Sequence, residues 1–213
     1  TVYAESMEKV IDGMQVARPT FMLAVPRVFE KAHAAIMGKM RGESSTKQKM
    51  FNWAMQVSDA YFDKIDRDLS HSLAEIALKQ AAFKMVLTKI YQRFGGRMRF
   101  FVSGGAPLSV SIIKLLRNAG LTVLEGYGLT ETIAPCTCNP LTKQVPGTVG
   151  IPLGDFQVKI NPDGEILVKS QAMFREYYKN PEATAEVFED GWFKTGDVGD
   201  FTDQGMLKIT DRK

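Results

Sequence analysis

The sequence is poor in cysteine, and its few cysteines stand close together. Among the 213 residues, Cys136 and Cys138 are the only two. A single intervening residue makes a bridge between them difficult, and the further Cys or His of a zinc site is missing around them. A disulfide scaffold is therefore excluded. We expect a reducing cytoplasm and interpret both cysteines as buried small apolar residues.

Neither charge is in strong excess. The sequence has 27 Lys and Arg against 24 Asp and Glu, so the net charge is 27 − 24 = +3. Because these charges are spread along the chain, no nucleic-acid partner is predicted. No run approaches the roughly 18 apolar residues of a membrane span, and the amino end lacks the regions of a signal peptide. Peripheral membrane contact stays open, and nothing indicates the oligomeric state.

What is present is typical of a globular protein, with 45% hydrophobic and 24% charged residues. The sequence starts at Thr1 without Met and stops at Lys213, directly after a predicted strand. We interpret it as a segment excised from a longer protein. Two histidines, His33 and His71, fall in predicted helical stretches without neighbouring metal ligands, and we interpret them as structural.

The stretch 28–94 contains no Pro and only two Gly, Gly38 and Gly42, and its apolar residues recur at helical spacing. It predicts a helical hairpin or a three-helix segment, with a polar interhelical turn at 42–47. Before it we expect a short helix at 7–14 and a buried strand at 20–25. Five methionines of this part either line a binding groove or pack in the core, and core packing is favoured: Met37, Met40, Met50, Met55 and Met85.

After Gly95 the pattern becomes that of an α/β fold. Residues 97–102 predict a strand, 107–119 a helix that ends at Gly120, and 121–125 a second strand. Ligands of such βαβ units usually lie at the carboxyl ends of the strands. The loops at 104–106 and 126–131 leave those ends, so the candidate site is expected there.

The last third predicts β-hairpins. The segments 156–160 and 165–169 flank the turn Asn161-Pro162-Asp163-Gly164, and 198–201 and 206–210 flank a second turn. Prolines and glycines cluster at 139–150. We therefore predict a first domain at 1–140 and a β-rich subdomain at 141–210.

The loop at 126–132 carries groups that suit a nucleotide. Its glycines allow close approach of the backbone, Tyr127 offers a stacking face, and Thr130 offers a hydroxyl donor. Glu131 offers a hard oxygen ligand suited to Mg²⁺. A glycine-rich turn with an exposed Glu explains the same spacing equally well, so both alternatives stay open at this point.

Several motifs resemble those of the adenylate-forming superfamily, which contains acyl-CoA synthetases, luciferases and peptide-synthetase adenylation domains. Tyr127-Gly128-Leu129-Thr130-Glu131-Thr132 resembles its YGxTE core. Further segments resemble its adenine-side loop, its DGEI hairpin, its TGD motif and the start of its hinge: Ser103–Leu108, Asp163–Ile166, Gly191–Asp197 and Asp211–Lys213. Within the superfamily, Val25–Lys31 and the long helical segment are similar to long-chain fatty acyl-CoA synthetases.

The resemblance implies a role for each matching residue. Adenine would be held, with stacking by Tyr127, around Gly104, Gly105, Ala106, Glu125, Gly126 and Tyr127. Thr130 would contact the α-phosphate, Glu131 the Mg²⁺, Asp197 the ribose hydroxyls and Arg212 the ribose region. Gly105 and Gly128 would border the acyl channel, and Asp211 would be the hinge.

The resemblance also implies the fold and the activity. The chain would be part of the large N-terminal α/β domain, with 211–213 beginning a hinge to a further domain. The phosphate loop and the C-terminal lysine of the family have no counterpart in the sequence. The implied enzyme uses Mg²⁺, ATP and CoA to activate a long-chain fatty acid, and this segment alone is expected to be inactive. The alternatives are an enzyme that passes the acyl group to a carrier protein, and a nucleotide-binding module without catalysis.

Overall fold

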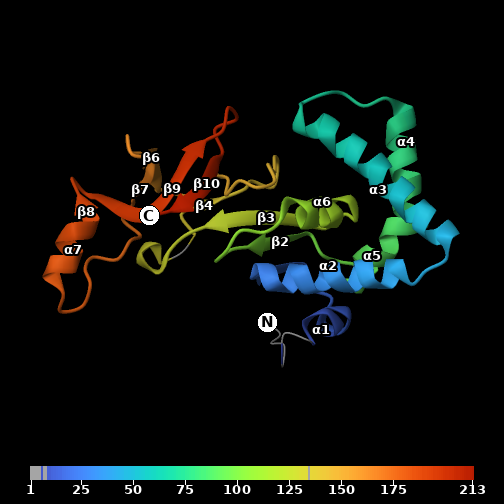
Figure 1. The fold of residues 1–213 in the computed structure, drawn as a ribbon, viewed down its shortest axis with the longest axis horizontal. Coiled ribbons are helices and arrows are strands. Elements are labelled where there is room, and N and C mark those ends of the chain that lie inside the picture. Colours follow the sequence, from blue (N-terminus) through green and yellow to red (C-terminus); the bar gives the residue numbers. More distant parts are fainter. Residues whose placement is uncertain (1–5, 7–8, 134) are drawn as a thin grey trace. The chain divides into compact units, whose positions relative to one another are not determined.

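The chain folds into one mainly helical unit, Thr1–Val123, and one mainly β unit, Leu124–Lys213 (Figure 1). The computed structural model describes residues 6, 9–133 and 135–213. The division into units lies before the predicted boundary at 140/141, which was placed from sequence composition and stays a prediction. Within the described residues no helix is both long enough and apolar enough to cross a membrane.

The predicted helical segment 28–94 is helical in the structure. The helices of the first unit up to this point are α1 (Val10–Ala17), α2 (Pro26–Arg41), α3 (Ser45–Asp66), α4 (Leu73–Ala82), the π-helical turn η1 (Phe83–Leu87) and α5 (Thr88–Arg93). The interhelical turn is shorter than predicted, because residues 45–47 already belong to α3. A second break at 67–72 was not predicted. It ends in a capping box, in which the Ser72 hydroxyl accepts from the Glu75 amide and the Glu75 carboxylate accepts from Ser72 N–H.

The predicted strand, helix and strand after Gly95 are present as β2 (Phe100–Ser103), α6 (Val110–Asn118) and β3 (Thr122–Tyr127). The first strand, β1 (Phe21–Ala24), pairs in parallel with β2. The prediction that β1 is buried is wrong, because Phe21 is 59% and Leu23 70% exposed. Only the alternate side chains of β1 face the core. The helix predicted from residue 107 begins at Val110, after the extended Ser109. The helix predicted at 7–14 corresponds to α1, and residues 7–8 of that predicted range lie outside the described part.

Aromatic side chains form the centre of the helical unit. Phe101 of β2 packs edge-to-face on Phe29 of α2 and on Phe94, with ring centroids 5.3 and 5.7 Å apart. All three side chains are fully buried. Helices α2 and α5 are thereby fixed against β2, and the loop that follows β2 starts from a rigid support.

The second unit is built of antiparallel strands. The end of β3 pairs with β4 (Thr137–Cys138), and β4 pairs with β5 (Ile151–Pro152). A further sheet has the order β10 (Leu207–Arg212), β9 (Trp192–Phe201), β7 (Glu165–Lys169) and β6 (Gln157–Ile160), with β8 (Phe188–Glu189) paired to β9. Both predicted hairpins are confirmed, and Gly164 has the positive φ of 85° that the turn requires.

Two features of this unit differ from the sequence analysis. Gly126 and Tyr127, predicted to be loop residues, are strand residues because they pair with Cys138 and Thr137. The helix α7 (Pro181–Val187) was not predicted. Its start is set by Asn180, whose side chain accepts a hydrogen bond from the Ala183 amide, and by Pro181 in the first turn.

Candidate functional site

Asp197 lies near the middle of β9, directly opposite Arg212 of β10. Only 8% of its surface is exposed. The preceding Gly196 has a φ of 73°, a conformation that side-chain-bearing residues rarely adopt. The backbone conformation at Gly196 therefore interrupts the regular strand, and the carboxylate of the next residue, Asp197, is nearly buried.

The Tyr127 hydroxyl occupies one oxygen of this carboxylate. It donates to Asp197 Oδ2 at 2.7 Å. Burial raises the pKa of Tyr127 well above its usual range, and the neighbouring Asp197 carboxylate raises it further. Tyr127 consequently stays protonated and remains a donor to Asp197 across the physiological range.

Arg212 approaches the other oxygen of Asp197. Its Nε lies 3.7 Å from Asp197 Oδ1, and its side chain is 76% exposed. An ion pair this long and this exposed contributes little to stability. The structure thus brings together three residues that the sequence analysis assigned to the nucleotide, Tyr127, Asp197 and Arg212.

Sequence reasoning missed that Glu165 of β7 supports this cluster, although it named the motif that contains Glu165. Glu165 accepts a hydrogen bond at 2.9 Å from Gly196 N–H with Oε1, and one at 2.8 Å from Lys213 Nζ with Oε2. Lys213 also donates to Asp163 at 2.6 Å, which lowers the pKa of the Asp163 carboxyl. The Asp-Gly-Glu-Ile motif was the sequence signal for these contacts. Its Glu165 binds the backbone N–H of Gly196, and both of its acids bind Lys213.

Glu131 lies in the short 3₁₀ turn η2 (Thr130–Thr132) and accepts a 2.9 Å hydrogen bond from the Tyr177 hydroxyl at Oε1. The preceding Thr130 is exposed. If Glu131 binds a metal ion, the other ligands of that ion have to come from neighbouring groups. The described residues contain no group of three or more His, Cys, Asp or Glu able to hold an ion. A cation here would take most ligands from phosphate and water, which is the usual way that Mg²⁺ binds with a nucleotide.

Strand β3 carries two further predicted residues of this unit, Glu125 and Gly126, and Gly128 follows it. Glu125 is buried, and its carboxylate accepts a 2.9 Å hydrogen bond from Gly147 N–H. A Cβ on Gly126 would meet the Thr137 carbonyl oxygen at 3.3 Å, so glycine allows the close pairing of β3 with β4. Gly128 is exposed. The adenine and acyl roles of these residues stay predictions.

Gly104, Gly105 and Ala106 follow β2 in the helical unit, and the last two are exposed. Gly105 has a φ of 83°, and a Cβ there would enter open space. Next to this loop the Ser103 hydroxyl is buried and has no hydrogen-bond partner among the described residues. Asp211, the predicted hinge, is exposed at a register shift between β9 and β10.

Cys136 and the histidines have structural positions. Cys136 is fully buried and donates to the Tyr127 carbonyl at 3.3 Å, and burial raises the pKa of its thiol to about 11. Cys138 is half-buried. His33 lies in α2, but His71 lies in the break before α4 rather than in a helix, where its ring stacks on Tyr61 at 4.0 Å.

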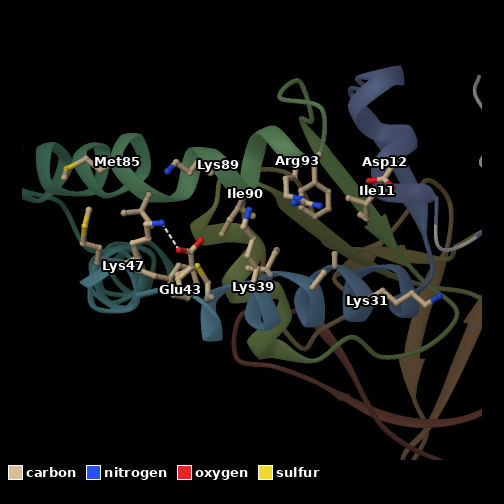
Figure 2. A pocket seen from close by; sticks show the side chains of 18 of the residues that line it. Ile11, Asp12, Lys31, Lys39, Glu43, Lys47, Met85, Lys89, Ile90 and Arg93 are labelled. Atoms are coloured by element: carbon tan, nitrogen blue, oxygen red, sulfur yellow. Dashed lines mark hydrogen bonds and ion pairs between the residues drawn. The ribbon is translucent and has the colours of Figure 1, made fainter. Parts of the chain in front are cut away.

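A separate cavity of about 1160 Å³ lies between α1, α2, α3 and the η1–α5 stretch of the helical unit (Figure 2). Three of the five methionines line it, Met40, Met50 and Met85. Met37, Met40 and Met55 pack against the core. Figure 2 shows Lys39 and Lys89 on facing sides of the cavity. Basic side chains outnumber acidic ones in the lining by five to two. Core packing is therefore confirmed for Met37, Met40 and Met55, and a binding groove lined by methionines stays a prediction.

Comparison with known proteins gives the family from the sequence and the fold from solved structures. The sequence model of the AMP-binding enzyme family matches residues 2–178. Long chain acyl-CoA synthetase 1 of Arabidopsis thaliana is 38% identical over 99% of this chain and 33% of its own length. Long-chain-fatty-acid--CoA ligase FadD15 of Mycobacterium bovis is 36% identical over 99% of this chain and 35% of its own length. The chain spans about a third of the length of these relatives.

Solved structures agree on the fold. An ATP-bound RpMatB-BxBclM chimera has 28% identity and a TM-score of 0.62 over 97% of this chain and 33% of its own. The N-terminal domain of FACL13 from Mycobacterium tuberculosis has 23% identity and a TM-score of 0.62 over the whole of this chain and 43% of its own. The α/β fold is that of the N-terminal domain of adenylate-forming enzymes, as predicted, and the chain belongs to the family of AMP-binding enzymes.

Proposed function

We propose that the chain is part of an ATP-dependent long-chain fatty acid–CoA ligase. The observation that carries this proposal is the Tyr127–Asp197–Arg212 cluster, in which a nearly buried carboxylate is fixed by one hydroxyl and faced by one exposed guanidinium. A carboxylate so held suits the two hydroxyls of a ribose, to which it offers charge-assisted hydrogen bonds. The names of the relatives support fatty acids as the substrate class.

The proposed reaction has two steps. The fatty-acid carboxylate attacks the α-phosphorus of ATP and forms an acyl-adenylate while pyrophosphate leaves. The CoA thiol then attacks the acyl carbon, and AMP leaves. No protein nucleophile is required, so the chain contributes alignment and electrostatic stabilisation.

Within this reaction each predicted residue keeps its proposed role. Thr130 would donate to the α-phosphate, and Glu131 would hold Mg²⁺, which supplies neutralisation of phosphate charge when bound. Adenine would lie along Gly104, Gly105, Ala106, Glu125, Gly126 and Tyr127. Gly105 and Gly128 would border the acyl chain, and Asp211 would be the hinge to a further domain.

The test is fatty-acid-dependent exchange of pyrophosphate into ATP by the purified full-length protein, followed by transfer to CoA. We expect exchange with long-chain fatty acids and formation of acyl-CoA. Exchange followed by transfer only to a carrier-protein pantetheine would favour the alternative acceptor. Nucleotide binding without any exchange would favour a module that has lost catalysis.

We also propose that the full-length protein is cytoplasmic and makes peripheral contact with membranes. The cavity between α2 and α5 supports membrane contact, because apolar side chains line it beside the exposed Lys39, Lys89 and Arg93. Anionic lipid attracts such cations at about 1 kcal/mol each. Sedimentation with phosphatidylglycerol vesicles, but not with phosphatidylcholine vesicles, is the expected result. Binding that survives Lys39→Glu with Lys89→Glu would contradict this assignment.

A further inference from the structure

The Tyr177 hydroxyl is directed at the carboxylate of Glu131, 46 positions earlier in the chain. The distance between the Tyr177 hydroxyl oxygen and Glu131 Oε1 is 2.9 Å. Burial and the Glu131 carboxylate both raise the pKa of Tyr177, with burial the larger cause. Tyr177 therefore remains a neutral donor across the physiological pH range.

The backbone around Tyr177 is fixed on both sides of it. Phe174 N–H donates to the Glu131 carbonyl oxygen at 2.9 Å, which joins the segment to η2 before Tyr177. Tyr177 N–H itself donates to Thr184 Oγ1 of α7 at 3.0 Å. The Tyr177 ring also packs on Phe174, with centroids 4.8 Å apart. The hydroxyl thus reaches Glu131 from an anchored segment, although residues 174–177 form no helix or strand.

We propose that Tyr177 is the positioning residue of Glu131 in the adenylation site. The hydrogen bond holds one carboxylate oxygen, and a carboxylate offers about four lone-pair sites, so coordination capacity remains for a cation. A fixed carboxylate loses less rotamer entropy when a cation binds than a mobile one does. Partners of this kind commonly contribute 10- to 100-fold to metal affinity or activity. The inference rests on the proposed role of Glu131.

The neighbouring Tyr178 supplies a matched control. It is 84% exposed and its ring contacts Lys179, so its hydroxyl takes no part in the Glu131 arrangement that the structure describes. Tyr177→Phe and Tyr178→Phe each remove one hydroxyl from adjacent residues and keep both rings. A difference between the two variants therefore reports the hydrogen bond to Glu131.

The experiment measures ATP affinity by calorimetry in the full-length protein, once with saturating Mg²⁺ and once with EDTA. The ratio of the two dissociation constants is the coupling between cation and nucleotide. We expect Tyr177→Phe to reduce this ratio by about tenfold and to leave AMP affinity and metal-free ATP affinity unchanged. Tyr178→Phe should match the wild type. A residue with a merely structural role would change AMP affinity as well, and that result would overturn the proposal.

A double-mutant cycle tests whether Tyr177 acts through Glu131. In a Glu131→Gln background, Tyr177→Phe should have no further effect on the coupling ratio. Additive effects of the two substitutions would contradict the positioning role while leaving the ligase proposal intact. A wild-type protein that binds ATP equally with and without Mg²⁺ would overturn both the positioning role and the metal role of Glu131. Pyrophosphate exchange, measured in parallel, distinguishes that failure from a failure of the ligase activity.

Discussion

Tyr127 donates a 2.7 Å hydrogen bond to Asp197, which lies 70 positions later in the chain. The bond joins the end of β3 to the middle of β9, and both side chains are more than nine-tenths buried. Because Tyr127 occupies Oδ2, the Oδ1 oxygen is the one that faces Arg212. The polar cluster is therefore organised by the fold before any nucleotide is bound.

Asp197→Ala should weaken ATP binding strongly without unfolding the protein. One charge-assisted hydrogen bond contributes about 1.5 to 3 kcal/mol, which corresponds to roughly tenfold to over a hundredfold in affinity. Calorimetric titration of the full-length protein with ATP measures this. Asp203→Ala, in the exposed turn between β9 and β10, is the control and should bind like the wild type. Unchanged affinity in a folded Asp197→Ala protein would refute the ribose role.

Glu131→Gln should impair adenylation more than the transfer to CoA. Glu131 would hold a cation that would supply neutralisation of phosphate charge, and pyrophosphate departs only in the first step. Supplying preformed acyl-adenylate should therefore restore most of the CoA transfer. The exposed Glu182→Gln is the control. Equal losses in both half-reactions would contradict a metal role for Glu131.

Stability of the protein should fall at alkaline pH in a way that depends on Cys136. Burial raises the pKa of this thiol from 9.0 to about 11. The folded state therefore favours the protonated thiol, and the resulting stabilisation is complete below about pH 9 and is lost as the pH rises through 11. Between about pH 8 and 10, the wild type should lose about 1.4 kcal/mol more unfolding free energy than Cys136→Ala. Urea denaturation at both pH values measures the difference, and equal losses would refute it.

The sequence could predict the elements that depend on local signals. Pro162 and Gly164 fix the turn between β6 and β7, and the absence of Pro from 28–94 marks the helical segment. The break at 67–72 was missed because its signal is a single capping box at Ser72 and Glu75. The burial of β1 was misjudged because an apolar sequence does not show which side chains another layer covers.

The candidate site was predictable only where a motif names the residue. Glu131, Asp197, Tyr127 and Arg212 were identified in this way, but the contacts made by Tyr177 and Glu165 were not. Tyr177 contacts Glu131 from an irregular segment, and Glu165 contacts Gly196 across two strands. Such contacts depend on tertiary register, which neither periodicity nor turn chemistry specifies.

The isolated 213-residue chain should bind AMP weakly and catalyse neither half-reaction. Tyr127, Asp197 and Arg212 are held together within the second unit, so ribose contacts are available. The sequence contains no counterpart of the phosphate loop or of the C-terminal lysine that the family resemblance implies. Because alignment of the triphosphate depends on several groups acting together, their loss removes most of the rate acceleration.

The exposed Phe21 and Leu23 of β1 should also promote self-association of this isolated chain. Sedimentation velocity should show species larger than the monomer, and Phe21→Ser with Leu23→Ser should reduce them. The catalytic test is pyrophosphate exchange driven by a long-chain fatty acid, with a no-protein blank. Exchange clearly above the blank would show that the essential groups lie within residues 1–213. The expectation that the phosphate loop and the C-terminal lysine are needed to align the triphosphate would then be wrong.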